Sequence, residues 1–268
     1  MLNILFWNLK RNSIEKLIVE CLVENNIDIA IFTEYNAIDL IEIEKNLGKM
    51  YVYVEGVQKD TKIIIIAKTT LEVTIIQQQN RYSLCQVKNA IQEYLLAGIH
   101  LEDRRNYKTA DRINNTINPL VNDIEQAERT FECDNTIVIG DFNADPYSEE
   151  LLSKYSFNAV LFKSIIEKNE FTNPISLPRK RFYNPMLHYI SEDTEMYGSF
   201  YYENDSMTSY WYCLDQILVR KNLVDMIKHV EYLKKIGTTN LLKNNVPDKS
   251  ISDHLPLLIK LQEVKNEA

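Results

Sequence analysis

A carboxylate and a carboxamide directly follow a run of branched apolar residues in the second half of the chain. Residues 137–139 read Ile-Val-Ile, Gly140 comes next, and Asp141 and Asn143 follow. Such a run predicts a short buried strand that ends at the glycine. In an extended chain, residues two apart point to the same side, so we expect Asp141 and Asn143 to face one space. This pair suits a site that holds a metal ion or a phosphate, although Asp and Asn also form ordinary turns.

Three further polar residues stand at the ends of apolar runs nearer the N-terminus. Asn8, Glu34 and His100 each come at, or just past, the C-terminal end of a strand-sized run. Taken singly, Asn8 fits a turn or capping residue, Glu34 a solvated acid and His100 a buried structural histidine. The possible function of each therefore depends on what the other strand ends carry.

The C-terminal part of the sequence adds three more candidates. Asp215 is embedded in the apolar sequence Cys-Leu-Asp-Gln-Ile-Leu-Val, and burial of a carboxylate is costly unless it is paired. We therefore expect Asp215 to have a partner. Asp253 and His254 stand in Ser-Asp-His-Leu-Pro, just before the last apolar run, residues 257–261.

The elements that must position these residues alternate between strand and helix at first. A helical pattern that begins at Ser13 separates strand-like residues 2–7 and 27–32, which predicts two parallel strands layered with a helix. A second helix is predicted over 106–131, with a break or kink at Pro119. Strand-sized runs with short polar breaks, typical of consecutive antiparallel strands, cover 50–54, 62–67, 71–76, 82–87 and 94–101.

After the Asp141 segment the pattern becomes less regular. Asp145 or Ser148 is placed to cap a short helix that ends at Lys154. Residues 155–200 contain three prolines and the basic sequence 179–181 beside several aromatic residues. Basic and aromatic side chains together can hold phosphates and stack bases, but a solvated loop explains them equally well.

The composition describes an ordinary globular protein of 268 residues with 45% hydrophobic and 25% charged residues. We expect one domain, 1–268, because no linker or repeat divides the chain. The four cysteines form no CxxC pair and are expected to be buried thiols of a reducing compartment. No run is long enough to span a membrane and the N-terminus resembles a strand rather than a signal peptide, which predicts a cytoplasmic protein.

The net charge of −8 argues against a protein that coats long nucleic acids over its whole surface. It is compatible with a small site that handles phosphates through bound cations, because carboxylates that hold metals add to the negative charge.

Taken in order, the strand-end residues resemble the successive motifs of the endonuclease/exonuclease/phosphatase superfamily, which has the DNase I-like fold. Each motif is short, but the six occur in family order over nearly the whole chain. They are Trp-Asn at 7–8, Thr-Glu at 33–34, His-Leu at 100–101, Gly-Asp-Phe-Asn at 140–143, Leu-Asp-Gln-Ile at 214–217 and Ser-Asp-His-Leu-Pro at 252–256.

The resemblance implies an α/β fold of four layers, α/β/β/α, in which two facing mixed β-sheets are flanked by helices. The site would lie where the strand ends of both sheets meet. The implied activity is that of a phosphoesterase that uses Mg²⁺, with Mn²⁺ as a substitute. A hard cation of this kind shields a phosphate and stabilises the leaving oxygen with few carboxylate ligands.

The resemblance also implies roles for individual residues. Glu34 would be the main metal ligand with Asn8 beside it, and Asp253 would bind a second metal or brace the site. Asp141 would position or deprotonate the attacking water, while Asn143 and His100 would hold phosphate oxygens. His254 would act as general acid or base, or as a phosphate clamp, oriented by Asp215, which would raise the pKa of the imidazole.

The chain departs from the family pattern at a few positions. Lys10 stands where some family nucleases have an acidic residue, residues 62–67 lack the usual arginine-glycine entry, and only Glu72 and Glu93 are candidates for a carboxylate that pairs with the middle histidine. These departures bear on DNA nicking and leave the phosphoesterase chemistry intact.

Three functions remain open on the sequence alone. The first is a nuclease with a nucleic acid partner, favoured by Arg104, Arg105, Arg112 and the basic sequence 179–181. The second is an enzyme for a small or lipid-linked phosphate, such as an inositol phosphate or a sphingomyelin-type head group. The third is a catalytically inactive binding module, which would have no need of Glu34, Asp141 and His254 together.

Overall fold

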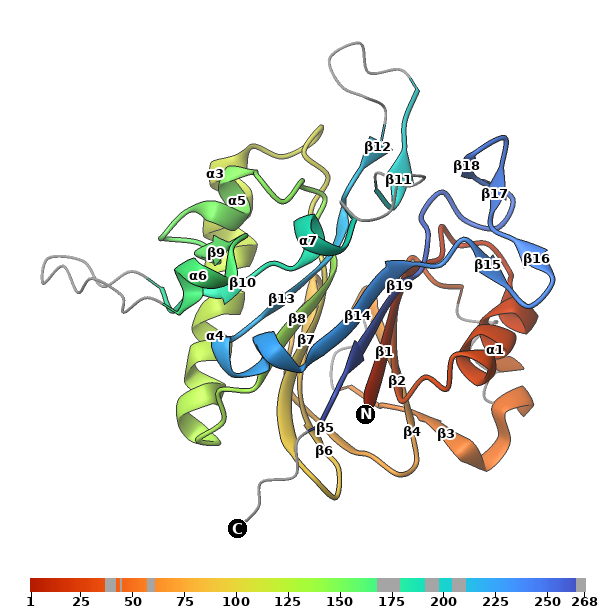
Figure 1. Cartoon of the computed structure of the whole chain (residues 1–268), viewed down its shortest axis with the longest axis horizontal. Helices are drawn as coiled ribbons and strands as arrows, with labels where there is room; N and C mark the ends of the chain where they lie inside the picture. Colours follow the sequence, from red (N-terminus) through yellow and green to blue (C-terminus); the bar gives the residue numbers. More distant parts are fainter. Residues whose placement is uncertain are drawn as a thin grey trace, which may run out of the picture.

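Two β-sheets lie face to face in the computed structural model, with helices on both outer faces (Figure 1). The structure describes residues 1–36, 42–43, 45–56, 61–167, 179–190, 198–203 and 211–263. Helix α1 (Glu15–Glu24) lies outside one sheet and α4 (Asn118–Thr130) lies outside the other. The predicted four-layer α/β/β/α sandwich is confirmed.

The first sheet has six strands in the order β14-β19-β1-β2-β4-β3. β1 and β2 are parallel, as the strand–helix–strand pattern predicted, and the remaining pairs are antiparallel. The strands are β1 (Leu2–Asn8), β2 (Ile29–Thr33), β3 (Tyr51–Tyr53), β4 (Ile63–Lys68), β14 (Ile227–Tyr232) and β19 (Leu257–Leu261).

The second sheet has seven strands in the order β5-β6-β7-β8-β13-β10-β9. It is also mixed, because β7 with β8 and β9 with β10 run parallel. The strands are β5 (Glu72–Gln78), β6 (Tyr82–Lys88), β7 (Glu93–His100), β8 (Thr136–Asp141), β9 (Ala159–Val160), β10 (Phe182–Tyr183) and β13 (Asp215–Val219).

Short elements complete the described chain. They are α3 (Thr109–Arg112), a π-helical turn (Ile113–Ile117), α5 (Glu149–Leu152), α6 (Lys163–Ile166), α7 (Met186–Ile190), 3₁₀ turns at Gly48–Met50 and Lys221–Met226, and the two-stranded ribbons β11 (Phe200–Tyr201) with β12 (Trp211–Tyr212), β15 (Lys235–Ile236) with β16 (Thr239–Asn240), and β17 (Leu242–Lys243) with β18 (Val246–Pro247).

The sandwich is held by two apolar layers. One lies between the sheets and extends under α1, and the other joins the second sheet to α4. The sheets approach closely at Gly98 of β7, where an added Cβ would lie 2.8 Å from Ile31 and 3.1 Å from Ile63. A glycine there lets the two sheets meet near the ends of β2, β4 and β7. The four cysteines are buried and unpaired, as expected.

Two local expectations are corrected. The runs 62–67 and 71–76 are successive strands but do not pair, because the chain crosses from one sheet to the other between β4 and β5. Ser148 precedes α5, but its hydroxyl donates to the Asp145 carbonyl at 2.6 Å instead of accepting from the helix, so neither predicted residue caps α5 with its side chain.

The predicted helix over 106–131 is divided as Pro119 suggested. A π-helical turn precedes α4, and Pro119 lies in the first turn of α4, where its missing N–H is least harmful. Leu120, Val121 and Ile124 are buried against the second sheet. None of the described helices is long and apolar enough to cross a membrane.

Candidate active site

The strand ends of both sheets open into one cleft of about 710 Å³. Parallel pairing places Asn8 of β1 opposite Thr33 of β2, and His100 of β7 opposite Asp141 of β8. Seven of the eight predicted site residues line this cleft, namely Asn8, Glu34, His100, Asp141, Asn143, Asp253 and His254. The eighth, Asp215, lies buried directly behind His254.

Asp215 has the partner that its burial required. Its Oδ2 lies 2.7 Å from Nδ1 of His254, a residue that comes from the other sheet's final loop. The Asp215 backbone is fixed by Ser199, whose Oγ accepts its N–H at 3.1 Å, and by Tyr232, whose hydroxyl donates to its carbonyl at 2.6 Å. Trp7 Nε1 donates to the His254 carbonyl at 3.0 Å. The imidazole is therefore held with Nε2 free for the cleft.

This pairing sets the charge of His254. Burial by itself lowers the pKa of the imidazole, but the Asp215 carboxylate, with Asp141 and Asp253 nearby, raises it to about 10. His254 is accordingly a cation at neutral pH. The imidazolium can donate a hydrogen bond or a proton to a phosphate oxygen in the cleft.

Asp141 lies beside this pair, at the end of β8. It is paired with Asp215 across the β8–β13 ladder, and it accepts the Asn8 side-chain amide at 3.2 Å and the Asn143 backbone N–H at 2.8 Å. Burial and the neighbouring Asp215 raise the pKa of Asp141 to about 7. Gly140 is required here, because a Cβ would collide with the carbonyl oxygen of Ile99 on β7.

Asn143 reaches the cleft by a different route from the one predicted. The strand ends at Asp141, and Asn143 adopts a left-handed conformation with φ of 47°. The two side chains face one space, as expected, but a turn and not an extended chain brings Asn143 there. The Asn143 side chain donates to the Leu101 carbonyl at 3.0 Å and lies on the cleft wall.

Glu34 and His100 lie beside Asp141 in the cleft. Glu34 has φ of 49°, unusual for a non-glycine residue, and its carboxylate is 37% exposed. His100 Nε2 lies 3.7 Å from Glu34 Oε1 and 3.8 Å from Asp141 Oδ2, beyond hydrogen-bond distance. Burial, with Arg81 nearby, lowers the pKa of His100 to about 3. We treat this imidazole as neutral, since the two carboxylates act too weakly at those distances to offset its burial.

The predicted carboxylate partner of His100 is also corrected. Glu93 lies at the start of β7 and Glu72 at the start of β5, both at the opposite ends of their sheet from His100. The carboxylates nearest to His100 in the described chain are Glu34 and Asp141, and its buried Nδ1 has no hydrogen-bond partner.

The oxygen donors of the cleft fit a hard divalent cation. The Glu34 carboxylate accepts no hydrogen bond from the described residues, and Asp253 makes only a 3.5 Å contact with Lys10. Burial, followed by the Asp215 carboxylate, raises the pKa of Asp141, and a bound cation would favour its ionised form. Asn8 is less free, because its Oδ1 accepts the Lys10 N–H at 3.1 Å.

One further group has metal-ligand spacing. Among the described residues, ligand atoms of Asp141, Asp215 and His254 lie within 4.8 Å of one another. However, His254 Nδ1 and Asp215 Oδ2 are already engaged with each other. A hard cation also prefers oxygen to imidazole nitrogen, so the Glu34 side of the cleft is the better site.

Most of the basic residues singled out in the sequence are not in the cleft. Arg112 is buried, where it pairs with Glu150 at 2.7 Å and donates to the Phe142 carbonyl at 2.5 Å. Arg179 and Lys180 pair with Glu125, Glu128 and Asp134 around α4, and Phe182 and Tyr183 beside them are buried. Only Arg104 and Arg105 of that set line the cleft.

Sequence reasoning missed two other cations that do line the cleft, Lys62 and Arg81. Each stands immediately before an antiparallel strand, β4 or β6. The beginning of such a strand lies at the same edge as the end of its neighbour, so the strand pattern contained a signal for both. The aromatic residues Phe200, Tyr202 and Tyr212 were also missed, and they line the same cleft.

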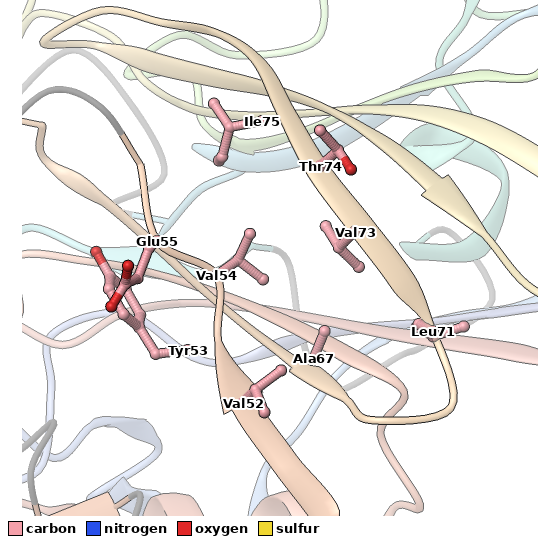
Figure 2. Close-up of a pocket in the computed structure, with 9 residues that line it drawn as sticks. All are labelled: Val52, Tyr53, Val54, Glu55, Ala67, Leu71, Val73, Thr74 and Ile75. Carbon is pink, nitrogen blue, oxygen red and sulfur yellow. The ribbon is translucent and has the colours of Figure 1, made fainter.

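A separate cavity of about 400 Å³ lies between β3–β4 and β5 (Figure 2). Val54, Ala67 and Val73 face one another across it, and Glu55 is the sole carboxylate among the residues that line it. Since its walls are mainly apolar, this cavity offers little for phosphate chemistry. The cleft at the strand ends is the candidate active site.

The fold is shared with several phosphoester-processing proteins of known structure. No protein-family model and no curated protein matches the sequence. D. rerio TDP2 in complex with a single-strand DNA product matches 96% of this chain and 97% of its own, with a TM-score of 0.59 and 17% identity. The mannosyl-6-phosphatase of Bacteroides thetaiotaomicron VPI-5482 matches 97% and 99%, with a TM-score of 0.60 and 17% identity.

A third similar structure is the endonuclease domain of TRAS1, a telomere-specific non-LTR retrotransposon, with a TM-score of 0.54 and 14% identity over 97% of this chain and 98% of that one. Similarity at these identities defines the fold. The chain has the fold of the endonuclease/exonuclease/phosphatase superfamily, as its six motifs predicted.

Proposed function

We propose that the protein is a divalent-metal-dependent phosphoesterase and that its substrate is a nucleic acid. The observation that carries the proposal is the placement of Asp141 beside the Asp215–His254 pair in a cleft that also holds Glu34. Both sheets contribute to this group, so we take residues 1–268 as one catalytic domain. The D. rerio TDP2 and TRAS1 structures have the same fold, which supports the proposal.

The residues on the β8–β13 side would accept and donate protons during the reaction. Asp141, with a pKa of about 7, would orient an attacking water and accept its proton. His254, protonated because of Asp215, would donate from Nε2 to the phosphate or the leaving oxygen. Asn8 would hold Asp141 in place through its amide, and Asn143 would contact a phosphate oxygen from the next turn.

Glu34 would be the principal ligand of Mg²⁺ or Mn²⁺, with Asp141 and Asn8 beside it and Asp253 at the rim. The bound cation would neutralise the phosphate and stabilise charge on the leaving oxygen. His100, neutral and between Glu34 and Asp141, would donate a hydrogen bond to a phosphate oxygen.

The rim of the cleft supports nucleic acid as the substrate. Arg104 and Arg105 line the cleft together with Phe200, Tyr202 and Tyr212. The Arg105 guanidinium lies 5.8 Å from the Tyr202 ring centre, so a cation and an aromatic ring are neighbours here. Cations next to aromatic faces can hold a phosphate backbone and stack bases.

A small phosphorylated molecule is the second candidate. The cleft volume of about 710 Å³ lies within the range of small-ligand pockets, and the Bacteroides mannosyl-6-phosphatase has the same fold.

The test is hydrolysis of a substrate panel in Mg²⁺, Mn²⁺ and EDTA. The panel holds single- and double-stranded DNA, RNA, an abasic duplex, inositol phosphates, sugar phosphates and bis-p-nitrophenyl phosphate, with Asp141→Asn as the blank. Metal-dependent cleavage of a nucleic acid, absent from the blank, would support the nuclease. Turnover of small phosphates alone would favour the second candidate. A folded protein that leaves the whole panel intact would contradict both.

A further inference from the structure

We propose that Arg11 and Lys62 form a second phosphate-binding subsite beside the catalytic centre, so that the preferred substrate carries a second phosphate besides the one hydrolysed. This inference rests on the proposed phosphoesterase function and adds a requirement on the substrate. Arg11 lies in the loop after β1, and Lys62 immediately precedes β4.

The subsite has its own space. A hollow of about 540 Å³ adjoins the active-site cleft and shares Glu34, Lys62 and His100 with it. Arg11, Tyr35, Asn36 and Thr61 complete its wall, and His254 is not part of it. A phosphate in this hollow would lie next to the catalytic centre without occupying it.

The two cations of this hollow, Arg11 and Lys62, form no ion pair within the described part of the chain. Four other cations near the cleft pair with carboxylates: Lys10 with Asp253, Arg81 with Glu102, Arg104 with Glu150 and Arg105 with Asp103. Arg11 and Lys62 have no carboxylate within ion-pair distance among the described residues.

Lys62 also has two cations, Arg81 and Arg11, near it. It is half-buried, and burial, followed by the positive charge of Arg81, lowers the pKa of its amine, with a smaller contribution from Arg11. Glu34 and Glu102 act in the opposite direction but less strongly than burial and Arg81. Cations that crowd together without a paired carboxylate are stabilised by an anionic ligand, and phosphate is the anion that the neighbouring site handles.

The backbone holds Arg11 at this place under strain. Lys10 and Arg11 have φ of 50° and 59°, and Glu34 has φ of 49°. The Arg11 N–H donates to the Glu34 carbonyl at 2.6 Å, so the two left-handed turns are locked together. Strained non-glycine residues of this kind concentrate at functional sites. This hydrogen bond ties the position of Arg11 to that of Glu34, the candidate metal ligand.

The second phosphate has two possible sources, which share one chemistry. It is either the neighbouring phosphate of a nucleic acid strand or the second phosphate of a small bisphosphorylated molecule. Substrate pairs that differ by one phosphate separate these sources. One pair is the p-nitrophenyl ester of thymidine 5′-phosphate with and without a 3′-phosphate, and the other is a sugar bisphosphate with its monophosphate.

The kinetic experiment compares kcat/KM within each pair for wild type, Lys62→Met and a control, Lys88→Met. Lys88 lies at the far end of β6 and is 41% exposed, so the control removes the same charge away from the cleft. We expect the second phosphate to raise kcat/KM at least tenfold in one pair. Lys62→Met should remove most of that gain, so that kcat/KM for the two members of the pair becomes nearly equal, and the control should keep the wild-type ratio.

If wild type has nearly the same kcat/KM with and without the second phosphate in both pairs, the proposal is overturned. It is also overturned if Lys62→Met lowers kcat/KM equally for both members of a pair. Binding of inorganic phosphate, measured by calorimetry in EDTA at low salt, provides a readout that needs no catalysis. Lys62→Met should weaken that binding at least fivefold relative to Lys88→Met, and equal binding would contradict the subsite. If no substrate is hydrolysed but phosphate binding depends on Lys62, the proposed function fails and the subsite stands.

Discussion

The two walls of the cleft differ in how firmly hydrogen bonds fix their charged groups. On the closed wall, formed by Asp141, Asp215 and His254, hydrogen bonds from backbone and side chains fix the two aspartates, and Asp215 fixes the imidazole through Oδ2. Among the buried side-chain atoms of this wall, only Asp215 Oδ1 has no partner within the described residues. On the open wall, formed by Glu34, Lys62 and His100, the Glu34 carboxylate accepts no hydrogen bond within the described chain, Lys62 has no ion pair, and His100 Nδ1 is unpartnered.

This difference corresponds to two functions, proton transfer and ligand binding. Proton transfer requires groups whose orientation and pKa are set in advance, and the closed wall provides them. Binding of a cation and a phosphate requires charges that the protein has not already paired, and the open wall provides those. We therefore expect substitutions on the closed wall to change turnover and pH dependence, and substitutions on the open wall to change ligand requirements.

The largest effect is expected at Asp141. Asp141→Asn should lower kcat by a factor on the order of 10² to 10⁴, because the amide cannot accept a proton from water. Stability should not fall. The pKa of Asp141 in the folded protein, about 7, lies above its ordinary value of 3.8, so the stability that the neutral carboxyl contributes is lost as the pH rises through 7. Above pH 7 the neutral variant should melt at the same temperature as wild type or higher.

The measurements are single-turnover rates and thermal melts at pH 8. A near-wild-type rate would remove Asp141 from the reaction. A large fall in melting temperature would attribute the lost activity to the fold and would break the contrast between the walls.

The next effect is expected from Asp215→Asn on the alkaline side of the pH profile. In wild type, activity that needs protonated His254 should decline only as the pH rises through about 10. Without the Asp215 carboxylate, burial is opposed only by the weaker effects of Asp141 and Asp253, so the decline should move to lower pH. Profiles of kcat between pH 5.5 and 10.5 provide the test, and an unchanged alkaline limb would show that Asp215 does not set the charge of His254.

The same substitution makes a prediction for stability. The folded pKa of His254, about 10, exceeds its ordinary value of 6.5, so the pair stabilises fully below pH 6.5 and its contribution disappears as the pH rises through 10. The difference in melting temperature between wild type and Asp215→Asn should therefore narrow across that range. A constant difference would indicate packing instead of charge.

A smaller effect on turnover, but a specific one, is expected at Glu34. Glu34→Gln should raise the Mg²⁺ concentration for half-maximal activity at least about tenfold, while kcat at saturating metal changes less. The side chain is partly exposed, so melting temperatures without metal should stay close to wild type. Metal titrations of both proteins decide the matter, and superimposable curves would remove Glu34 from the metal site.

The smallest effect is expected at His100. Because its pKa is lowered to about 3, His100 is neutral throughout the working range and should act only as a hydrogen-bond donor. His100→Gln should lower kcat/KM about tenfold, the worth of one hydrogen bond, without altering the shape of the pH profile. Loss of a limb of the profile in this variant would mean that His100 titrates.

The strands and their polar ends were predictable because periodicity records burial directly. The run 137–139 gave a buried strand, the pattern around α1 gave a parallel pair, and an acid within apolar residues gave Asp215 a partner. The motif order then predicted the four-layer sandwich. The first three predictions need only local pattern or the cost of burying a charge, whereas the four-layer sandwich came from the resemblance to the superfamily.

The role of the basic residues was not predictable in the same way. Arg112 and Arg179 were interpreted as possible nucleic acid contacts, yet each pairs with an acid 38 or 54 positions away in sequence. Lys62, which was not among the predicted phosphate-binding residues, lines the cleft. A charge shows its partner only after the chain folds, because side chains far apart in sequence become neighbours only in the folded chain.

The sequence by itself determined which chemical groups stand at strand ends and in what order. Tertiary structure decided their state: His254 becomes a cation and His100 stays neutral although both are buried histidines in one cleft. The physical reason is that a pKa depends on burial and on the charges nearby, and the partner that decides His254 lies 39 residues away on another sheet. In the sequence the two imidazoles are chemically identical, and only the folded protein gives them different charges.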